Sequence, residues 1–129
     1  MAQIKIYGVA EHLRPIQAHL SDVIHACVVE ALDYPPGKRF HRFLALQPED
    51  FVFPSDRSAQ YTIIEISMFE GRSAAARKRL ITLLFAKIAS EIGIDPQDVE
   101  ITITETPRAN WGIRGRPGDE LGLEYRVEV

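Results

Sequence analysis

The first part of the chain changes from strand-like to helix-like spacing. Residues 4–8 alternate between apolar and polar side chains, which predicts a strand. The apolar positions that follow recur every three or four residues and predict a helix over 12–32 with one apolar face. These positions are Leu13, Ile16, Leu20, Val23, Ile24, Cys27, Val28 and Ala31. The prolines and glycine at 35–37 end this helix, and 39–46 is predicted to be a second strand.

The second half of the chain repeats this order. Residues 61–69 predict a strand, 73–92 a helix and 99–104 a further alternating strand. The pattern is therefore a pseudo-repeat of 2–46 and 61–105. Crossovers between parallel strands are right-handed, so both helices are expected on the same side. We predict an α+β fold of two tandem β-α-β units, with a four-stranded sheet and two helices on one face.

A sheet covered by helices on one side has a bare second face. We assign Phe43, Ile101 and either Ile63 or Ile64 to that face. Such an apolar surface is too large for a soluble monomer, so other copies of the chain are expected to cover it.

The segments outside the repeats are shorter. Residues 47–60 are predicted to be a loop containing one short extended piece at 51–53. The alternating segment within 119–129 is predicted to be an edge strand or a strand exchanged between subunits. We expect residues 1–129 to form a single domain.

Composition excludes several classes of protein. The net charge of −3 provides no general attraction to nucleic acid, and only the basic run 77–79 favours it. No apolar run is long enough to span a membrane, and the first residues lack the apolar region of a secretory signal. The single cysteine, Cys27, fits a reducing cytoplasm. No zinc-binding spacing or phosphate-binding loop is present, so neither metal nor cofactor is expected.

Several arginines near the ends of the predicted strands are candidate substrate-binding residues. Planar guanidinium groups bind carboxylates at two points, so these arginines indicate a small carboxylate substrate. The candidates are Arg39, Arg42, Arg72, Arg114 and Arg116, with Trp111 beside the last two.

Structural roles are the alternatives for several of these residue types. Trp111 has the alternative role of a packing residue. His25 is interpreted as a core histidine bonded to a backbone carbonyl, and Arg57 as tying down its loop beside Asp56. Residues 77–79 are interpreted as the solvated face of the second helix.

Several short motifs occur in a familiar order. They are Pro35-Pro36-Gly37, Gly71-Arg72-Ser73, the run from Gly93 to Val99, and Asn110-Trp111-Gly112. In this order the chain resembles the tautomerase superfamily over nearly its whole length. It is most similar to the branch with malonate semialdehyde decarboxylase and the cis-3-chloroacrylic acid dehalogenases. The resemblance implies a homotrimer of double β-α-β subunits.

The resemblance also implies a catalytic amino-terminal proline, but Ala2 fills that position here. Alanine is small, so removal of Met1 is plausible. The resulting amine has a reference pKa of about 7.7–8.0, which suits a general base, and a primary amine can also form a Schiff base. The alternative is that the catalytic group has been lost and the fold persists as a binding protein.

Two further positions depart from the family pattern, Lys38 and Glu70, while Arg72 matches it. These departures weigh against decarboxylase or hydratase activity. Keto–enol isomerisation of a small 2-oxo carboxylate requires fewer catalytic groups, namely one amine and one cation, and is the leading expectation. Ala2 would move the proton, Arg72 and Arg39 would hold the substrate, and Trp111 with Arg114 would wall the pocket. The alternative is a noncatalytic trimer that binds a small anion or a protein partner.

Overall fold

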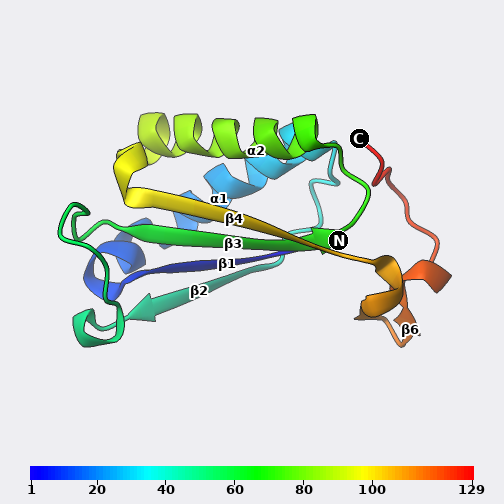
Figure 1. Ribbon diagram of the computed structural model, residues 1–129, viewed down its shortest axis with the longest axis horizontal. Coiled ribbons are helices and arrows are strands. Elements are labelled where there is room, and N and C mark those ends of the chain that lie inside the picture. Colours follow the sequence, from blue (N-terminus) through cyan, green and yellow to red (C-terminus); the bar gives the residue numbers. More distant parts are fainter.

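The sheet of the computed structural model, which describes residues 1–129, has the strand order β2-β1-β3-β4 (Figure 1). The strands are β1 (Ala2–Val9), β2 (His41–Leu46), β3 (Thr62–Phe69) and β4 (Val99–Thr106). β1 pairs in parallel with β2, and β3 pairs in parallel with β4. The central pair, β1 and β3, is antiparallel. The predicted double β-α-β arrangement is confirmed.

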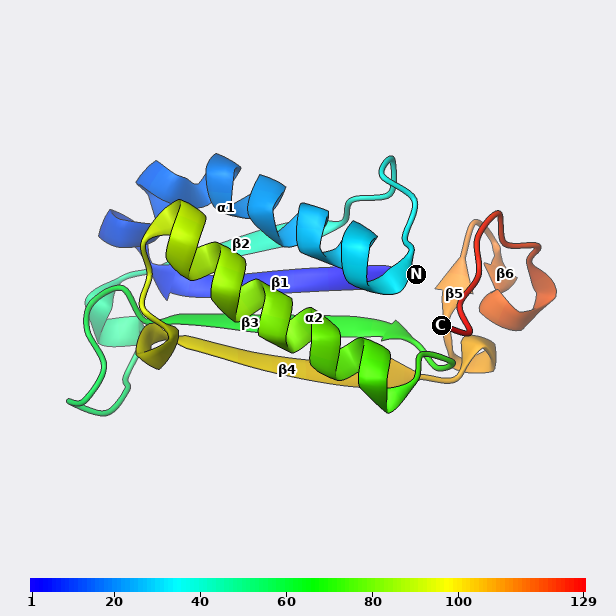
Figure 2. The same ribbon diagram turned by 90° about the horizontal axis from the view of Figure 1, so that it is seen from above.

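Both helices cross the same face of the sheet, as Figure 2 shows. α1 (Ala10–Leu32) begins two residues earlier than predicted. α2 (Ala74–Lys87) begins after Ser73, whose hydroxyl accepts a hydrogen bond from the Ala76 N–H at 3.1 Å. A π-helical turn, Ile88–Ile92, extends α2 to the predicted end. Neither helix has a segment long and apolar enough to cross a membrane.

The core lies between the sheet and the helices. Alternate residues of β1 and β3 are buried there against apolar residues of both helices. Phe43 and Ile101 pack against this same core, beside Ile6 and Ile64 in the strand register. Their assignment to the bare face was therefore wrong, and of the predicted residues only Ile63 lies there.

The face away from the helices is mostly polar. By register it carries residues of alternating strand positions, namely Lys5, Tyr7, Arg42, Leu44, Ile63, Glu65, Ser67, Glu100, Thr102 and Thr104. The Tyr7 hydroxyl donates a hydrogen bond to Glu65 Oε1 at 2.5 Å. The predicted large apolar surface is absent, so that argument for covering this face with other subunits no longer holds.

The C-terminal segments gather at one end of the sheet (Figure 1). A short hairpin, β5 (Gly112–Ile113) and β6 (Arg116–Pro117), follows β4. The strand predicted within 119–129 is not formed, since 118–120 is a single 3₁₀ turn and 121–129 has no regular structure. The predicted extended piece at 51–53 pairs with no strand.

Candidate functional site

The chain start is buried at the end of the sheet where the C-terminal segments lie. Met1 and Ala2 are each only 4% exposed. Ala2 pairs with Met68 of β3, and the Phe69 N–H donates to the Met1 carbonyl at 3.2 Å. Because β1 and β3 are antiparallel, the start of β1 lies beside the residues that follow β3.

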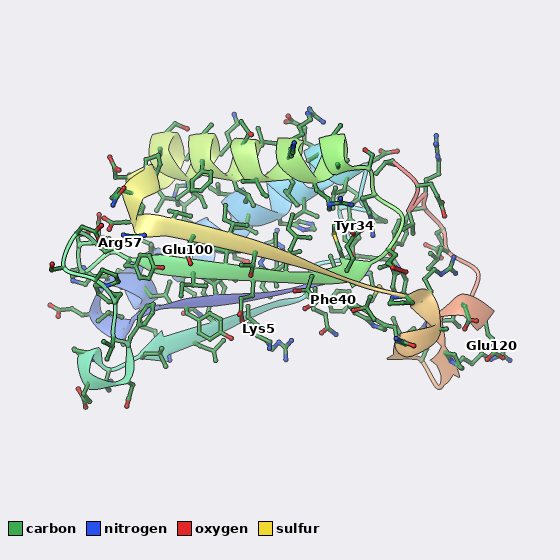
Figure 3. All side chains as sticks on the ribbon, in the orientation of Figure 1. Lys5, Tyr34, Phe40, Arg57, Glu100 and Glu120 are labelled. Carbon is green, nitrogen blue, oxygen red and sulfur yellow. The ribbon has the colours of Figure 1, made fainter.

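Two tyrosine hydroxyls contact the first two nitrogens of the chain. The Ala2 N–H donates to Tyr34 Oη at 3.1 Å, and the Met1 amine donates to Tyr125 Oη at 2.5 Å. The two rings pack edge to face, with centroids 5.2 Å apart. Burial raises the pKa of Tyr34 to about 12 and also raises the pKa of Tyr125. Both hydroxyls therefore keep their protons at neutral pH. Figure 3 labels Tyr34 at this end of the molecule.

Arg72 brings an incompletely paired guanidinium to this cluster. Arg72 is only 3% exposed, and its Nη1 donates a hydrogen bond to the Phe69 carbonyl at 3.3 Å. Nε and Nη2 are buried without a hydrogen-bond partner. Burial lowers the pKa of Arg72. Buried donors without partners are unfavourable, so an anion bound here would satisfy them.

Gly71 determines how the chain reaches Arg72. Its φ of +132° lies in a region that side chains rarely adopt. A Cβ placed on Gly71 would come within 2.9 Å of Val127 Cγ1. The glycine therefore permits both the turn after β3 and the close approach of the C-terminal segment.

The chain start has a strongly positive environment. Burial, followed by the charges of Arg72, Lys38 and Arg108, lowers the pKa of the Met1 amine from 8.0 to about 4. Lys38 Nζ lies 5.7 Å from the centroid of the Tyr125 ring. None of these three cations takes part in a salt bridge. The arrangement favours an uncharged amine and a bound anion.

Met1 fills an apolar space beside these groups. It forms a small buried cluster with Phe69 and Val127, against which Trp111 and Tyr125 are partly packed. The Phe69 and Trp111 rings meet edge to face, 5.1 Å between centroids. The structure thus brings Ala2, Arg72 and Trp111 to one place, and loss of Met1 would open a space between them.

The remaining predicted site residues lie elsewhere in this subunit. Arg39 forms an ion pair with Asp22 at 2.6 Å. Arg42 donates to Gln3 Oε1 at 3.3 Å. Arg114 and Arg116 are exposed in the hairpin. No single subunit gathers these four arginines around Arg72.

Sequence reasoning missed part of the cluster. Tyr34 directly precedes the Pro-Pro-Gly turn, and Tyr125 lies in the alternating segment interpreted as a strand. Lys38 was noted only as a departure from the family pattern. The guanidinium of Arg108 donates to the carbonyls of Gly118 and Leu121, which holds the last turns in place.

The histidines lie apart from this cluster. His25 Nε2 is hydrogen-bonded to the Pro36 carbonyl at 2.6 Å, which confirms its interpretation as a core histidine. His41 Nδ1 lies 2.7 Å from Ser21 Oγ. The structure holds no group of three or more His, Cys, Asp or Glu side chains placed to bind a metal ion.

Comparisons with known proteins agree with this architecture. A family model described as "Tautomerase enzyme" matches residues 38–114, more than half of the chain. The 2-hydroxymuconate tautomerase of Pseudomonas putida is 36% identical over 58 residues, which cover 45% of this chain and 92% of that protein. The probable tautomerase YrdN of Bacillus subtilis (strain 168) is 28% identical over 98 residues, covering 71% and 74%.

Solved structures show the same fold. Malonate semialdehyde decarboxylase, solved in wild-type, mutant and inactivated forms, matches with a TM-score of 0.80 and 22% identity, over 92% of this chain and 99% of that chain. Native fused 4-OT matches with a TM-score of 0.81 and 20% identity, over 94% and 99%. Together with the family match, these likenesses place the chain in the tautomerase superfamily, and it belongs to the family described as "Tautomerase enzyme".

Proposed function

We propose that this protein catalyses the keto–enol isomerisation of a small 2-oxo carboxylate. The observation that carries the proposal is the buried Arg72 guanidinium, with Nε and Nη2 unpaired, beside an equally buried chain start. The proposal requires a mature chain that begins at Ala2, whose amine would then be the base.

The contacts support a role for each group. An uncharged Ala2 amine would take a proton from the carbon next to the carbonyl and return it to the product. Arg72 would bind the carboxylate and stabilise the developing enolate. Tyr34, which lies 3.1 Å from the Ala2 nitrogen and stays protonated, would donate a hydrogen bond to the enolate oxygen. The reaction needs no cofactor.

We also propose that the protein is a cytoplasmic homotrimer. Fused 4-OT has been solved as symmetric and asymmetric trimers, and those chains share this fold. Arg39, Arg42, Arg114 and Arg116 lie away from Arg72 in their own subunit, so they would act at the site only from a neighbouring one. The polar sheet face would then line the interior of the assembly.

The test begins with the mature amino terminus. Mass spectrometry is expected to find Ala2 as the first residue. An assay of phenylpyruvate enol ketonisation should then show turnover by the natural protein, and Ala2→Pro should retain or increase it, because proline supplies a more basic secondary amine. Retention of Met1 would remove the proposed base and overturn the proposal.

A noncatalytic anion-binding protein is the second candidate. Ala2 stands where the resemblance implies proline, and Met1 occupies the pocket in this structure. If the natural protein shows no ketonisation while Ala2→Pro creates it, the natural protein is a binder on a catalytically competent scaffold.

A further inference from the structure

The Ala2 nitrogen makes one side-chain hydrogen bond in the structure, to Tyr34 Oη at 3.1 Å. Pairing of Ala2 with Met68 fixes the strand on which this nitrogen lies. In a chain that starts at Ala2, the nitrogen is a primary amine facing the space now filled by Met1. That space is bounded by Phe69, Val127 and Tyr125.

The surroundings favour the nucleophilic form of such an amine. Burial and three nearby cations lower the pKa of the Met1 amine to about 4. The Ala2 nitrogen lies one residue further along the chain, in a residue that is only 4% exposed, and contacts the Tyr34 hydroxyl. A buried primary amine next to a cation keeps its lone pair at neutral pH and attacks carbonyl carbon. Arg72 provides the second contact, since its free Nε and Nη2 would hold a carboxylate.

We propose that the mature chain condenses its Ala2 amine with the carbonyl group of a 2-oxo acid to form an imine. The nitrogen attacks the carbonyl carbon, and a C–N bond forms while the carbonyl oxygen gains a proton. The two hydrogens of the amine leave with that oxygen as water, and the C=N bond is the product. Tyr34, hydrogen-bonded at the nitrogen, is placed to assist proton movement to the oxygen.

This inference rests on the same site as the proposed function, but it does not require isomerisation. An imine withdraws electrons from the neighbouring carbon more strongly than a ketone does. The site would thus activate a 2-oxo acid covalently, which differs from proton transfer by a free amine.

Reductive trapping tests the proposal. The purified protein is incubated with pyruvate and sodium cyanoborohydride, digested and mapped by mass spectrometry. We expect the peptide that begins at Ala2 to gain the mass of one reduced pyruvate. Fragmentation separates the Ala2 amine from Lys5 Nζ in the same peptide. Labelling at Ala2 should exceed that at any lysine by about tenfold.

Two controls show whether the site directs the reaction. Acetone, which lacks the carboxylate, should label Ala2 about tenfold less than pyruvate, and this measurement needs no variant. Arg72→Gln should lower pyruvate trapping by about tenfold, whereas Lys78→Gln, a change on the exposed face of α2, should leave it unchanged.

The trapping experiment and the ketonisation assay can fail independently, so the imine and the proposed isomerase activity are tested separately. Equal labelling by acetone and pyruvate, labelling spread evenly over the lysines, or a retained Met1 would each overturn the imine. Trapping at Ala2 without enol ketonisation supports the imine and contradicts the isomerase. Ketonisation without trapping overturns the imine alone.

Discussion

The two corners of the central strand pair look alike in topology and differ in chemistry. At the first corner β1 begins beside the end of β3, and at the second β3 begins beside the end of β1. The first holds the chain start, Arg72 and two tyrosines. The second is a small cavity lined by residues such as Gly8, His12, Tyr61, Thr62 and Ile94, with no arginine or lysine.

The difference shows that the repeat alone does not make a site. At the second corner Tyr61 precedes β3 without a break, so the first nitrogen of that strand is a peptide nitrogen without base strength. α1 begins directly after β1, leaving no turn like Gly71-Arg72. The reactivity that we propose for the first corner therefore depends on the removal of Met1 and on the short turn before α2.

The largest expected effect is a loss of activity at the first corner that has no counterpart at the second. Arg72→Gln should lower kcat/KM for enol ketonisation about 100-fold, roughly 2.7 kcal/mol, because the carboxylate and enolate lose their buried cation. His12→Gln at the second corner should change it less than about twofold. Steady-state kinetics on the two variants would measure this. Equal losses would mean that the second corner contributes to the reaction.

The glycines at the two corners should differ in their contribution to stability. Gly71→Ala places a Cβ 2.9 Å from Val127 at a positive φ, so it should lower the free energy of unfolding by about 2 kcal/mol. Gly8→Ala meets Leu13 Cβ at 3.3 Å, with no such φ, and should cost at most about 1 kcal/mol. Urea unfolding of both variants gives the comparison. A larger loss for Gly8→Ala would contradict it.

The end of the sheet with the chain start should also dominate the pH dependence of stability. Burial, with His25 and Arg39, lowers the pKa of His41 from 6.5 to about 4, and His41 opens β2 at this end. Between these values the unfolded chain binds more protons, so the free energy of unfolding falls by about 2 kcal/mol as pH drops from 6.5 to 4. Thermal denaturation across this range should show a shallower slope for His41→Asn. An unchanged slope for His41→Asn would contradict the prediction.

The smallest expected effect is on anion binding and comes from the electrostatic field of Lys38 at the first corner. Lys38 is half-buried, so Lys38→Gln should weaken 2-oxobutyrate binding about threefold, and less at high salt. Lys78→Gln is the charge-matched control and should have no effect. Isothermal titration at two salt concentrations would distinguish them. No change for Lys38→Gln would remove that side chain from the site.

The alternation of residues predicted the strands but not their faces. β2 has apolar side chains on both sides, as Phe43 and Leu44 show, so periodicity alone cannot tell which side meets the helices. Alternation also misled at the C-terminus. Tyr125 and Val127 are both packed against the chain start, so the pattern arises from one buried side without a partner strand.

The sequence located the arginines but not the directions of their side chains. Arg39 follows the Pro-Pro-Gly turn as expected, yet Asp22 of α1 pairs with it. Ala2 lies near Arg72 because β1 and β3 are antiparallel, which places the start of β1 beside the end of β3. These two segments are about seventy residues apart in the sequence, so no local pattern shows that they meet. Tyr34 and Tyr125 were missed for the same reason, because no local pattern marks a contact with the chain start.

The position of Val127 beside Gly71 has a practical consequence for anyone producing this protein. Val127 is buried and the Ser73 hydroxyl donates to the Val129 carbonyl, so the last residues cover the first ones. A purification tag fused to the N-terminus would block the Ala2 nitrogen that we propose as the base. A tag fused to the C-terminus would disturb the residues that pack over it. Samples intended for assay should be expressed untagged, or with a cleavable handle that leaves both ends native.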